Sequence, residues 1–230
     1  MASKAKVREQ EAEVIEEVLE EGGSSIDTFI AQNKNLLLVG VGVILLIIGG
    51  LAFFNYTKEA QNTEAHAEMF RAVKYFEVDS LDRALNGDGG MLGFLDIEND
   101  YSGTAAANMA KYYIGIIYLK QGNTDDGIEY LESFSKGDDF LSMGAYTALG
   151  FAYEDQGDAS KAASLFEKAA RTPAENDKTT PTMLLNAGRN YEAAGNPGKA
   201  KSLYQEIKDE YPFSSEGLNI DKYLGRVAGA

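Results

Sequence analysis

The apolar stretch at residues 36–54 constrains this chain more than any other feature. Its 19 residues, LLLVGVGVILLIIGGLAFF, include no charged side chain. As a helix the stretch would be about 28 Å long, close to the hydrocarbon thickness of a bilayer. A cleaved signal peptide would begin near residue 1 and have a shorter apolar run, whereas here 35 residues come first. We therefore expect an uncleaved transmembrane helix at residues 36–56, with Tyr56 at the membrane interface.

Residues 1–35 form an acidic leader. Residues 6–21 have a narrow apolar stripe at helical spacing, made of Val7, Val14, Ile15, Val18 and Leu19. We expect this helix to stop at Gly22 and Gly23, and a second helix to begin after Ser25 as N-cap. Because the leader is rich in Glu rather than Lys or Arg, it fits a protein partner better than a lipid surface. A frayed, solvated tail is the alternative.

Net charge and cysteine content exclude several functions. The formal charge is −15, so nucleic acid and anionic lipid are poor ligands for this chain. With no cysteine, disulfides and thiolate chemistry are excluded. Basic residues lie on both sides of the apolar run, with Lys34 before it and Lys58, Arg71 and Lys74 after it. The positive-inside rule therefore leaves the orientation of the span open.

After the apolar run, one pattern occurs three times. A glycine is followed three residues later by a tyrosine and seven residues later by a second glycine. Five residues after the second glycine comes a small residue, and nine residues after it comes a bulky apolar residue. These positions are Gly115, Tyr118, Gly122, Gly127 and Leu131; Gly150, Tyr153, Gly157, Ala162 and Phe166; and Gly188, Tyr191, Gly195, Ala200 and Tyr204. Such spacing predicts two helices joined by a tight turn, with the first glycine allowing close approach.

This pattern resembles the tetratricopeptide repeat, whose unit is about 34 residues. The matched glycines are 35 and 38 residues apart, and the closing proline of the family pattern is present as Pro212. The resemblance implies an all-α solenoid over residues 57–230, with repeats at about 108–140, 143–176 and 181–213.

Two further segments complete the predicted solenoid. A degenerate repeat at about 63–102 comes first, because Phe94, Ile97 and Tyr101 match the spacing of Tyr204, Ile207 and Tyr211; the first helix of this repeat is expected at 63–85. A capping helix is expected at about 217–228, with Ile220, Tyr223, Leu224 and Val227 on its apolar face. Terminal repeats are often atypical because one face has no neighbour.

No catalytic constellation is recognisable in the sequence. His66 is the only histidine, and no carboxylate cluster accompanies it. The segment with Gly87, Gly89 and Gly90 lacks the Lys and Ser or Thr of a phosphate loop, and is interpreted as a linker. We expect no catalytic, cofactor or metal site and no small-molecule substrate. A membrane-anchored enzyme is the less favoured alternative.

A protein-binding groove remains as the expected functional surface. In the family that the repeats resemble, the first helices line a concave groove for a peptide or protein. The corresponding residues here are Tyr112, Ile116, Lys120, Thr147, Phe151, Glu154, Leu185, Arg189 and Glu192. Tyr112, Ile116 and Phe151 make this groove apolar, which suits an extended or helical hydrophobic segment. For each residue, packing within the superhelix is the alternative.

The whole layout is similar to the YfgM-like ancillary subunits of the bacterial SecYEG translocon. This resemblance implies a leader in the cytoplasm, one span in the inner membrane and repeats in the periplasm. It also implies as partners a SecYEG-type translocon, a PpiD-like periplasmic chaperone and emerging polypeptides. A repeat scaffold in another envelope assembly, for secretion, division or outer-membrane biogenesis, is the alternative function.

Overall fold

The computed structural model describes residues 2–137, 140–172 and 178–229, with side chains described from residue 32 onward except at 37. The chain divides into two units, Met1–Thr57 and Lys58–Ala230. Helix α1 (Ala2–Glu77) contributes residues to both. All regular elements in the described ranges are helices, which confirms the predicted all-α class.

The first unit is helical with one interruption. Asn33 has non-helical backbone angles (φ −110°, ψ 15°), and the helix continues through Gly22, Gly23 and Ser25. The predicted stop at the two glycines, and the predicted cap at Ser25, are therefore wrong. A glycine weakens a helix by about 1 kcal/mol relative to alanine, but it does not end one unless the backbone turns into the left-handed region.

The part of α1 that begins at Gln32 is long and apolar enough to cross a membrane, judged by length and composition. Its large side chains are not covered by protein: Leu36, Leu46 and Phe53 are at least 70% exposed. Exposed apolar side chains in an unbroken run are unusual on a protein surface.

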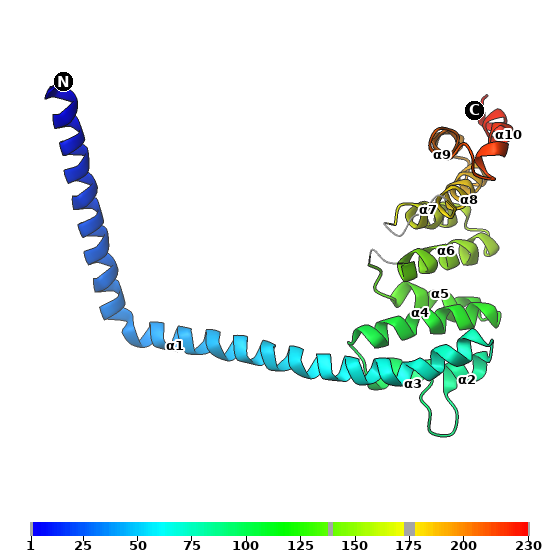
Figure 1. The fold of residues 1–230 in the computed structure, drawn as a ribbon, viewed down its shortest axis with the longest axis horizontal. Helices are drawn as coiled ribbons and strands as arrows, with labels where there is room; N and C mark the ends of the chain where they lie inside the picture. Colours follow the sequence, from blue (N-terminus) through cyan, green and yellow to red (C-terminus); the bar gives the residue numbers. More distant parts are fainter. Residues whose placement is uncertain (1, 138–139, 173–177, 230) are drawn as a thin grey trace. The chain divides into compact units, whose positions relative to one another are not determined.

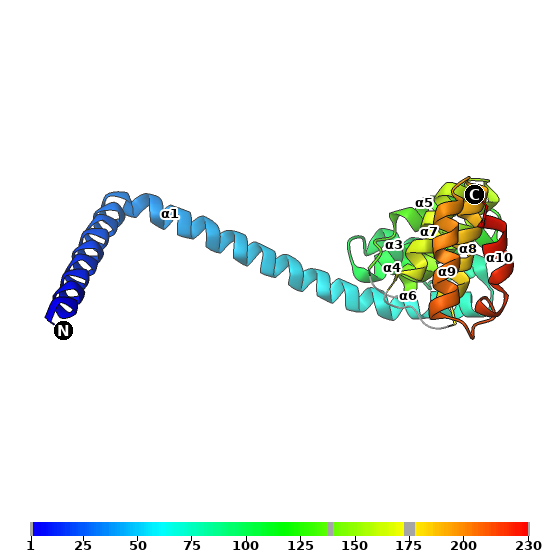
Figure 2. The same ribbon diagram turned by 90° about the horizontal axis from the view of Figure 1, so that it is seen from above.

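The second unit is a stack of helix pairs. Figures 1 and 2 show them in chain order, from cyan at the end of α1 to red at α10. The pairs are α4 (Ala105–Lys120) with α5 (Thr124–Ser133), α6 (Phe140–Asp155) with α7 (Ala159–Ala170), and α8 (Thr180–Ala193) with α9 (Pro197–Glu210). A short 3-10 helix (Gly217–Asn219) and α10 (Asp221–Val227) follow. Ile220 and Val227 are buried at this end, so α10 covers the last pair.

The turn inside each pair has one geometry. The glycines at 122, 157 and 195 have φ between 74° and 82°, a conformation that glycine adopts without steric cost. In each turn the next residue donates its backbone N–H to the carbonyl of the repeated tyrosine, as Asn123 does to Tyr118 over 2.9 Å. This is the Schellman ending of a helix, and it positions the second helix of each pair.

The degenerate first repeat differs from its prediction. The helix expected at 63–85 ends at Glu77, because Asp79 adopts the left-handed conformation (φ 57°) and Ser80 donates to the carbonyl of Tyr75 over 2.8 Å. This is the same Schellman ending, with an aspartate in place of glycine. The second helix is then split into α2 (Leu81–Asn86) and α3 (Phe94–Asp100).

A loop between α2 and α3 splits that second helix. The loop leaves the helix and rejoins it at almost the same point. Asp88 and Met91 exchange two backbone hydrogen bonds of 3.0 Å, and Gly89 and Gly90 both have positive φ. A Cβ on Gly93 would lie 2.3 Å from the backbone nitrogen of Gly87. The glycine segment is therefore a loop inserted within the second helix of this repeat. Its interpretation as the linker between the two helices was wrong, because the turn at Asp79 makes that link.

Candidate protein-binding surface

Close packing of each helix pair fixes the positions of the first helices α4, α6 and α8. The repeated glycine of each first helix lies against a bulky side chain of the second: a Cβ on Gly115 would lie 2.6 Å from Leu131, and one on Gly188 2.3 Å from Tyr204. The first helix of each pair is therefore held directly against the second, and side chains four residues apart on it lie on one face.

A hollow of about 260 Å³ lies between α4 and α6, and we call it the α4–α6 hollow. It is lined by Ile116, Leu119, Lys120, Thr124, Ala148, Phe151, Ala152 and Asp155. Three predicted groove residues therefore come together here: Ile116, Lys120 and Phe151. Phe151 is 46% exposed, and its ring rests edge-on against Phe166 with centroids 4.9 Å apart. The ring is thus supported from below while one face stays accessible.

Lys120 sits at the rim of this hollow. Its Nζ lies 2.8 Å from a carboxylate oxygen of Asp79 and 5.4 Å from the ring centroid of Phe76. Both side chains of the ion pair are about half exposed or more, so the pair contributes little to stability.

The other predicted groove residues make contacts within the stack. Tyr112 is half-buried with its hydroxyl against Gly144, and burial raises its pKa. Thr147 donates its hydroxyl to the Met143 carbonyl over 2.8 Å. Leu185 is partly buried against the core, and Arg189 is exposed.

Two predicted acidic residues are engaged by neighbouring helices. Glu154 accepts a hydrogen bond of 3.1 Å from the buried amide of Asn190 in α8. Glu192 accepts from the hydroxyl of Tyr204 and from Arg226 of α10, the latter over 2.9 Å. Burial and the hydrogen bond to Glu192 raise the pKa of Tyr204. Glu192 thus joins the cap to the last repeat and lies outside the α4–α6 hollow.

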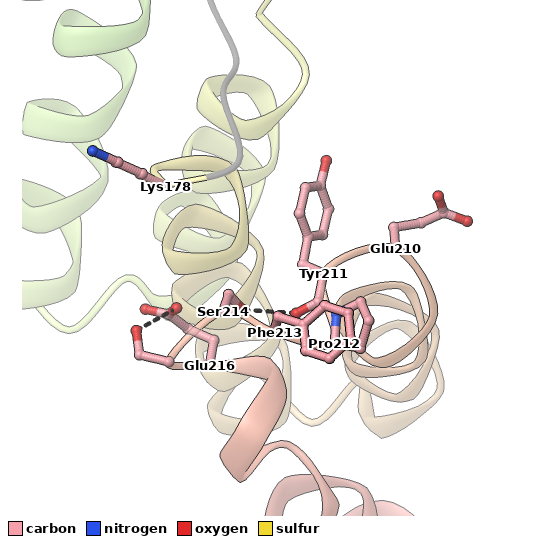
Figure 3. Close-up of a pocket in the computed structure, with 8 residues that line it drawn as sticks. Lys178, Glu210, Tyr211, Pro212, Phe213, Ser214 and Glu216 are labelled. Carbon is pink, nitrogen blue, oxygen red and sulfur yellow. Dashed lines mark hydrogen bonds between the residues drawn. The ribbon is translucent and has the colours of Figure 1, made fainter.

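A second hollow, of about 440 Å³, lies beside the turn that follows α9 and was not among the sequence-based expectations. Figure 3 shows Tyr211, Pro212 and Phe213 in this turn, with Lys178 across from them. The polar groups of the turn bond to one another: Ser214 donates to the Tyr211 carbonyl over 2.9 Å, and Ser215 to Glu216 over 2.8 Å. We interpret the segment after α9 as a structural turn that closes the repeat, and we do not assign a binding role to the hollow beside it.

Comparison with known families decides what the helix pairs are. Models of the tetratricopeptide repeat match residues 109–136, 144–176 and 183–214. These three segments are tetratricopeptide repeats. The matched ranges contain α5, α7 and α9 together with most of each preceding helix. Such repeats indicate a scaffold for protein–protein interaction, and the family is typically non-enzymatic.

Solved structures support the same fold. This chain is similar to two crystal structures of nearly identical TPR-like repeats from a candidate kinesin light chain of Podospora anserina. One of the two is a variant with a glutamine-to-methionine substitution. The other is 15% identical with a TM-score of 0.52 and covers 73% of this chain and 87% of that one. The variant is 14% identical with a TM-score of 0.51, at 73% and 86% coverage. At this identity the likeness shows the fold alone. No curated protein matches the chain.

Proposed function

We propose that this protein is a membrane-anchored scaffold whose α4–α6 hollow binds an apolar segment of a partner protein. The observation that carries the proposal is the convergence of Ile116 and Phe151 in one accessible hollow, on repeats of a family that binds proteins. Lys120 and Asp155 at its edge provide a polar rim around an apolar centre. This is the usual composition of a protein-binding site.

The anchor in this proposal is the apolar part of α1. Its exposed leucines and phenylalanines have no protein cover among the described residues, and a bilayer would provide it. We place the leader in the cytoplasm and the repeats in the periplasm of a bacterial inner membrane. A tether of this kind raises the local concentration of the hollow toward a neighbouring partner to about the millimolar range, so tight binding is not needed.

The specific assembly we propose is the Sec translocon. The layout of one span followed by a short repeat array resembles the ancillary subunits that link the channel to a membrane-anchored periplasmic chaperone. In that role the hollow would hold the chaperone, or an emerging polypeptide, next to the channel exit.

The partner test uses tagged full-length protein purified from native membranes in mild detergent, with co-purifying proteins identified by mass spectrometry. We expect translocon subunits and a periplasmic chaperone. Recovery of a different envelope complex in their place would refute the translocon role and retain the scaffold.

Variants then test the hollow itself. Phe151→Ala should reduce partner recovery about tenfold, the loss expected for a central aromatic anchor. Phe213→Ala is the matched control, since Phe213 is 92% exposed and lies in the turn after α9. Circular dichroism checks that both variants keep their helical content. Equal recovery with the two variants would contradict the assignment of the hollow.

Topology has an independent test, because the chain has no cysteine. Single substitutions Ser3→Cys and Lys222→Cys place one thiol in the leader and one in the exposed face of α10. A membrane-impermeant maleimide should label the α10 thiol in intact spheroplasts and the leader thiol only after lysis. Labelling of the leader in intact spheroplasts would overturn the orientation.

A further inference from the structure

In two helix pairs, the repeated tyrosine contacts a lysine of the same chain through both its ring and its hydroxyl. Lys161 lies 3.8 Å from the ring centroid of Tyr153 and donates a hydrogen bond to its hydroxyl. That hydroxyl donates to Glu132 of the preceding pair over 2.7 Å, and Lys161 is 3.0 Å from the same carboxylate. One cation is thus shared by an aromatic face, a hydroxyl and a carboxylate.

The same arrangement occurs one repeat later. Lys199 lies 4.6 Å from the ring centroid of Tyr191 and donates to its hydroxyl over 3.1 Å, while the hydroxyl donates to Glu167 over 2.7 Å. In both repeats the lysine comes eight residues after the tyrosine, and the glutamate directly follows the bulky apolar residue of the preceding repeat.

The degenerate repeat contains a variant of this arrangement. Arg83, eight residues after Tyr75, has its guanidinium carbon 5.9 Å from that ring centroid. The Tyr75 hydroxyl donates to Asp88 over 2.7 Å. Three of the four repeated tyrosines therefore have an internal cation and an internal carboxylate.

Tyr118 is the exception. The residue eight positions later is Asp126, and the position that corresponds to Glu132 and Glu167 is Leu95. Within the described ranges, the Tyr118 side chain contacts the ring of Tyr130, with centroids 5.6 Å apart, and makes no hydrogen bond. The place that a lysine takes at Tyr153 is therefore not filled by this chain's own cation.

A hollow of about 540 Å³ is present at this place, and we call it the Tyr118 hollow. It is lined by Glu98, Lys111, Tyr118, Asp126, Glu129, Tyr130 and Ser133. Three carboxylates face one amine, that of Lys111, which is 3.9 Å from Glu98. In the part of the chain that the structure describes, Asp126 and Glu129 form no ion pair, and no group of His, Asp and Glu side chains could hold a metal ion.

We propose that the Tyr118 hollow binds an arginine or lysine side chain of a partner polypeptide. The incoming cation takes the place at Tyr118 that Lys161 takes at Tyr153, with Asp126 and Glu129 supplying the negative charge. Asp126 stands where the other repeats have a lysine or an arginine. The tyrosine site therefore lacks a cation from its own chain and carries a negative charge that attracts a cation from another molecule. None of the residues that line the α4–α6 hollow lines this one. The two proposed sites can therefore be tested independently of each other.

The test follows the tyrosines directly by fluorine NMR. Full-length protein in detergent micelles is labelled with 3-fluorotyrosine, and Tyr118→Phe and Tyr153→Phe identify the two signals of interest. The probes are the tripeptide acetyl-Gly-Arg-Gly-amide, its lysine counterpart, and a citrulline counterpart that keeps the shape of arginine without its charge.

We expect the arginine and lysine peptides to shift the Tyr118 signal saturably. The citrulline peptide should bind about fivefold more weakly, which is the size of an exposed cation–π contribution. The Tyr153 signal should stay in place, because Lys161 already occupies that ring. Asp126→Lys, a substitution at an exposed position, should abolish the shift at Tyr118. The matched variant Lys161→Ala should make the Tyr153 signal responsive.

Three results would overturn the proposal. The first is no saturable shift at Tyr118 with either basic peptide. The second is an equal response to the citrulline peptide or to magnesium ions alone, which would show that the charge of a side chain is not recognised. The third is a response that persists in Asp126→Lys, which would place binding elsewhere. Partner recovery through Phe151 is unaffected by any of them.

Discussion

Replacing Gly188 by alanine tests the packing on which the repeat stack depends. The added Cβ would lie 2.3 Å from Cε1 of Tyr204 and 2.9 Å from two further ring carbons, well inside normal contact. Tyr204 is fully buried, is hydrogen-bonded to Glu192, and lies 5.4 Å from the ring of Tyr223, so it has no room to move aside. Overpacking costs about 1–3 kcal/mol, and against a ring that cannot move we expect the upper part of that range, about 2–3 kcal/mol; the helix regains about 1 kcal/mol by losing a glycine.

The expected net destabilisation is about 1–2 kcal/mol. For a unit of this size each kcal/mol lowers the melting temperature by about 2–4 °C, so the melting temperature should fall by about 2–8 °C. The measurement is thermal unfolding of the full-length protein in detergent, followed by circular dichroism. Gly198→Ala is the control: it is also a helical glycine, but nothing lies within 4 Å of its added Cβ, so stability should stay the same or rise by up to about 1 kcal/mol. A Gly188→Ala protein as stable as the control would refute the packing argument.

Three further predictions concern the turns and the internal cation sites. Asp79→Gly should stabilise the protein by about 0.5–1 kcal/mol in chemical unfolding, because Asp79 has a φ of 57° and its ion pair is exposed; a loss of stability would contradict this. Lys161→Met should lower the melting temperature by about 1–3 °C at low salt and by less in 1 M salt, since it removes the charge over Tyr153 but keeps the side-chain stem. The hydrogen bond from Tyr153 lowers the pKa of Glu132 below its ordinary value of 4.5, so this carboxylate stabilises the fold above that pH and the gain is lost as pH falls further. Burial raises the pKa of Tyr153 above 10.0, so its contribution is lost as pH rises above that value; melting temperatures from pH 3 to 11 should decline at both ends, and less so in Tyr153→Phe.

The repeats were predictable because their determinants are local. A glycine that permits close approach, a tyrosine one turn later and a glycine in the turn form a pattern that spacing alone reveals. The same spacing argument could have placed the break at Asp79, because Tyr75 occupies the position in the first repeat that Tyr118 occupies in the next. Aspartate in the position of a turn glycine concealed it, because aspartate also occurs within helices.

The first repeat also shows why a local pattern can be interrupted without being lost. Ala84 takes the place of the small residue, and the loop between Gly87 and Gly93 then interrupts the helix before Phe94, which takes the place of Leu131, Phe166 and Tyr204. Ala72 stands where the other repeats have glycine and is fully buried. Phe94 is fully buried, as Leu131, Phe166 and Tyr204 are. Only the folded arrangement, in which the loop closes on itself, shows that Phe94 follows Ala84 in the repeat.

The internal cation sites depend on contacts between repeats, which spacing within one repeat does not reveal. The lysines eight residues after Tyr153 and Tyr191 are visible in the sequence, but each carboxylate comes from the preceding helix pair and is recognised only once the pairs are stacked. The contact between Phe151 and Phe166 is different, because both rings belong to the same helix pair.

Variation among near-equivalent repeats is what gives this scaffold distinct surfaces. Where Lys161 and Lys199 fill their tyrosine sites, the stack is closed and gains cohesion between neighbouring pairs. At Tyr118 the cohesion is given up and an acidic, aromatic hollow takes its place. In our two proposals a single basic side chain binds weakly there, and an apolar segment binds weakly in the α4–α6 hollow. A partner that engaged both at once, or one held beside them by the proposed membrane anchor, would gain from effective concentration what neither contact supplies alone.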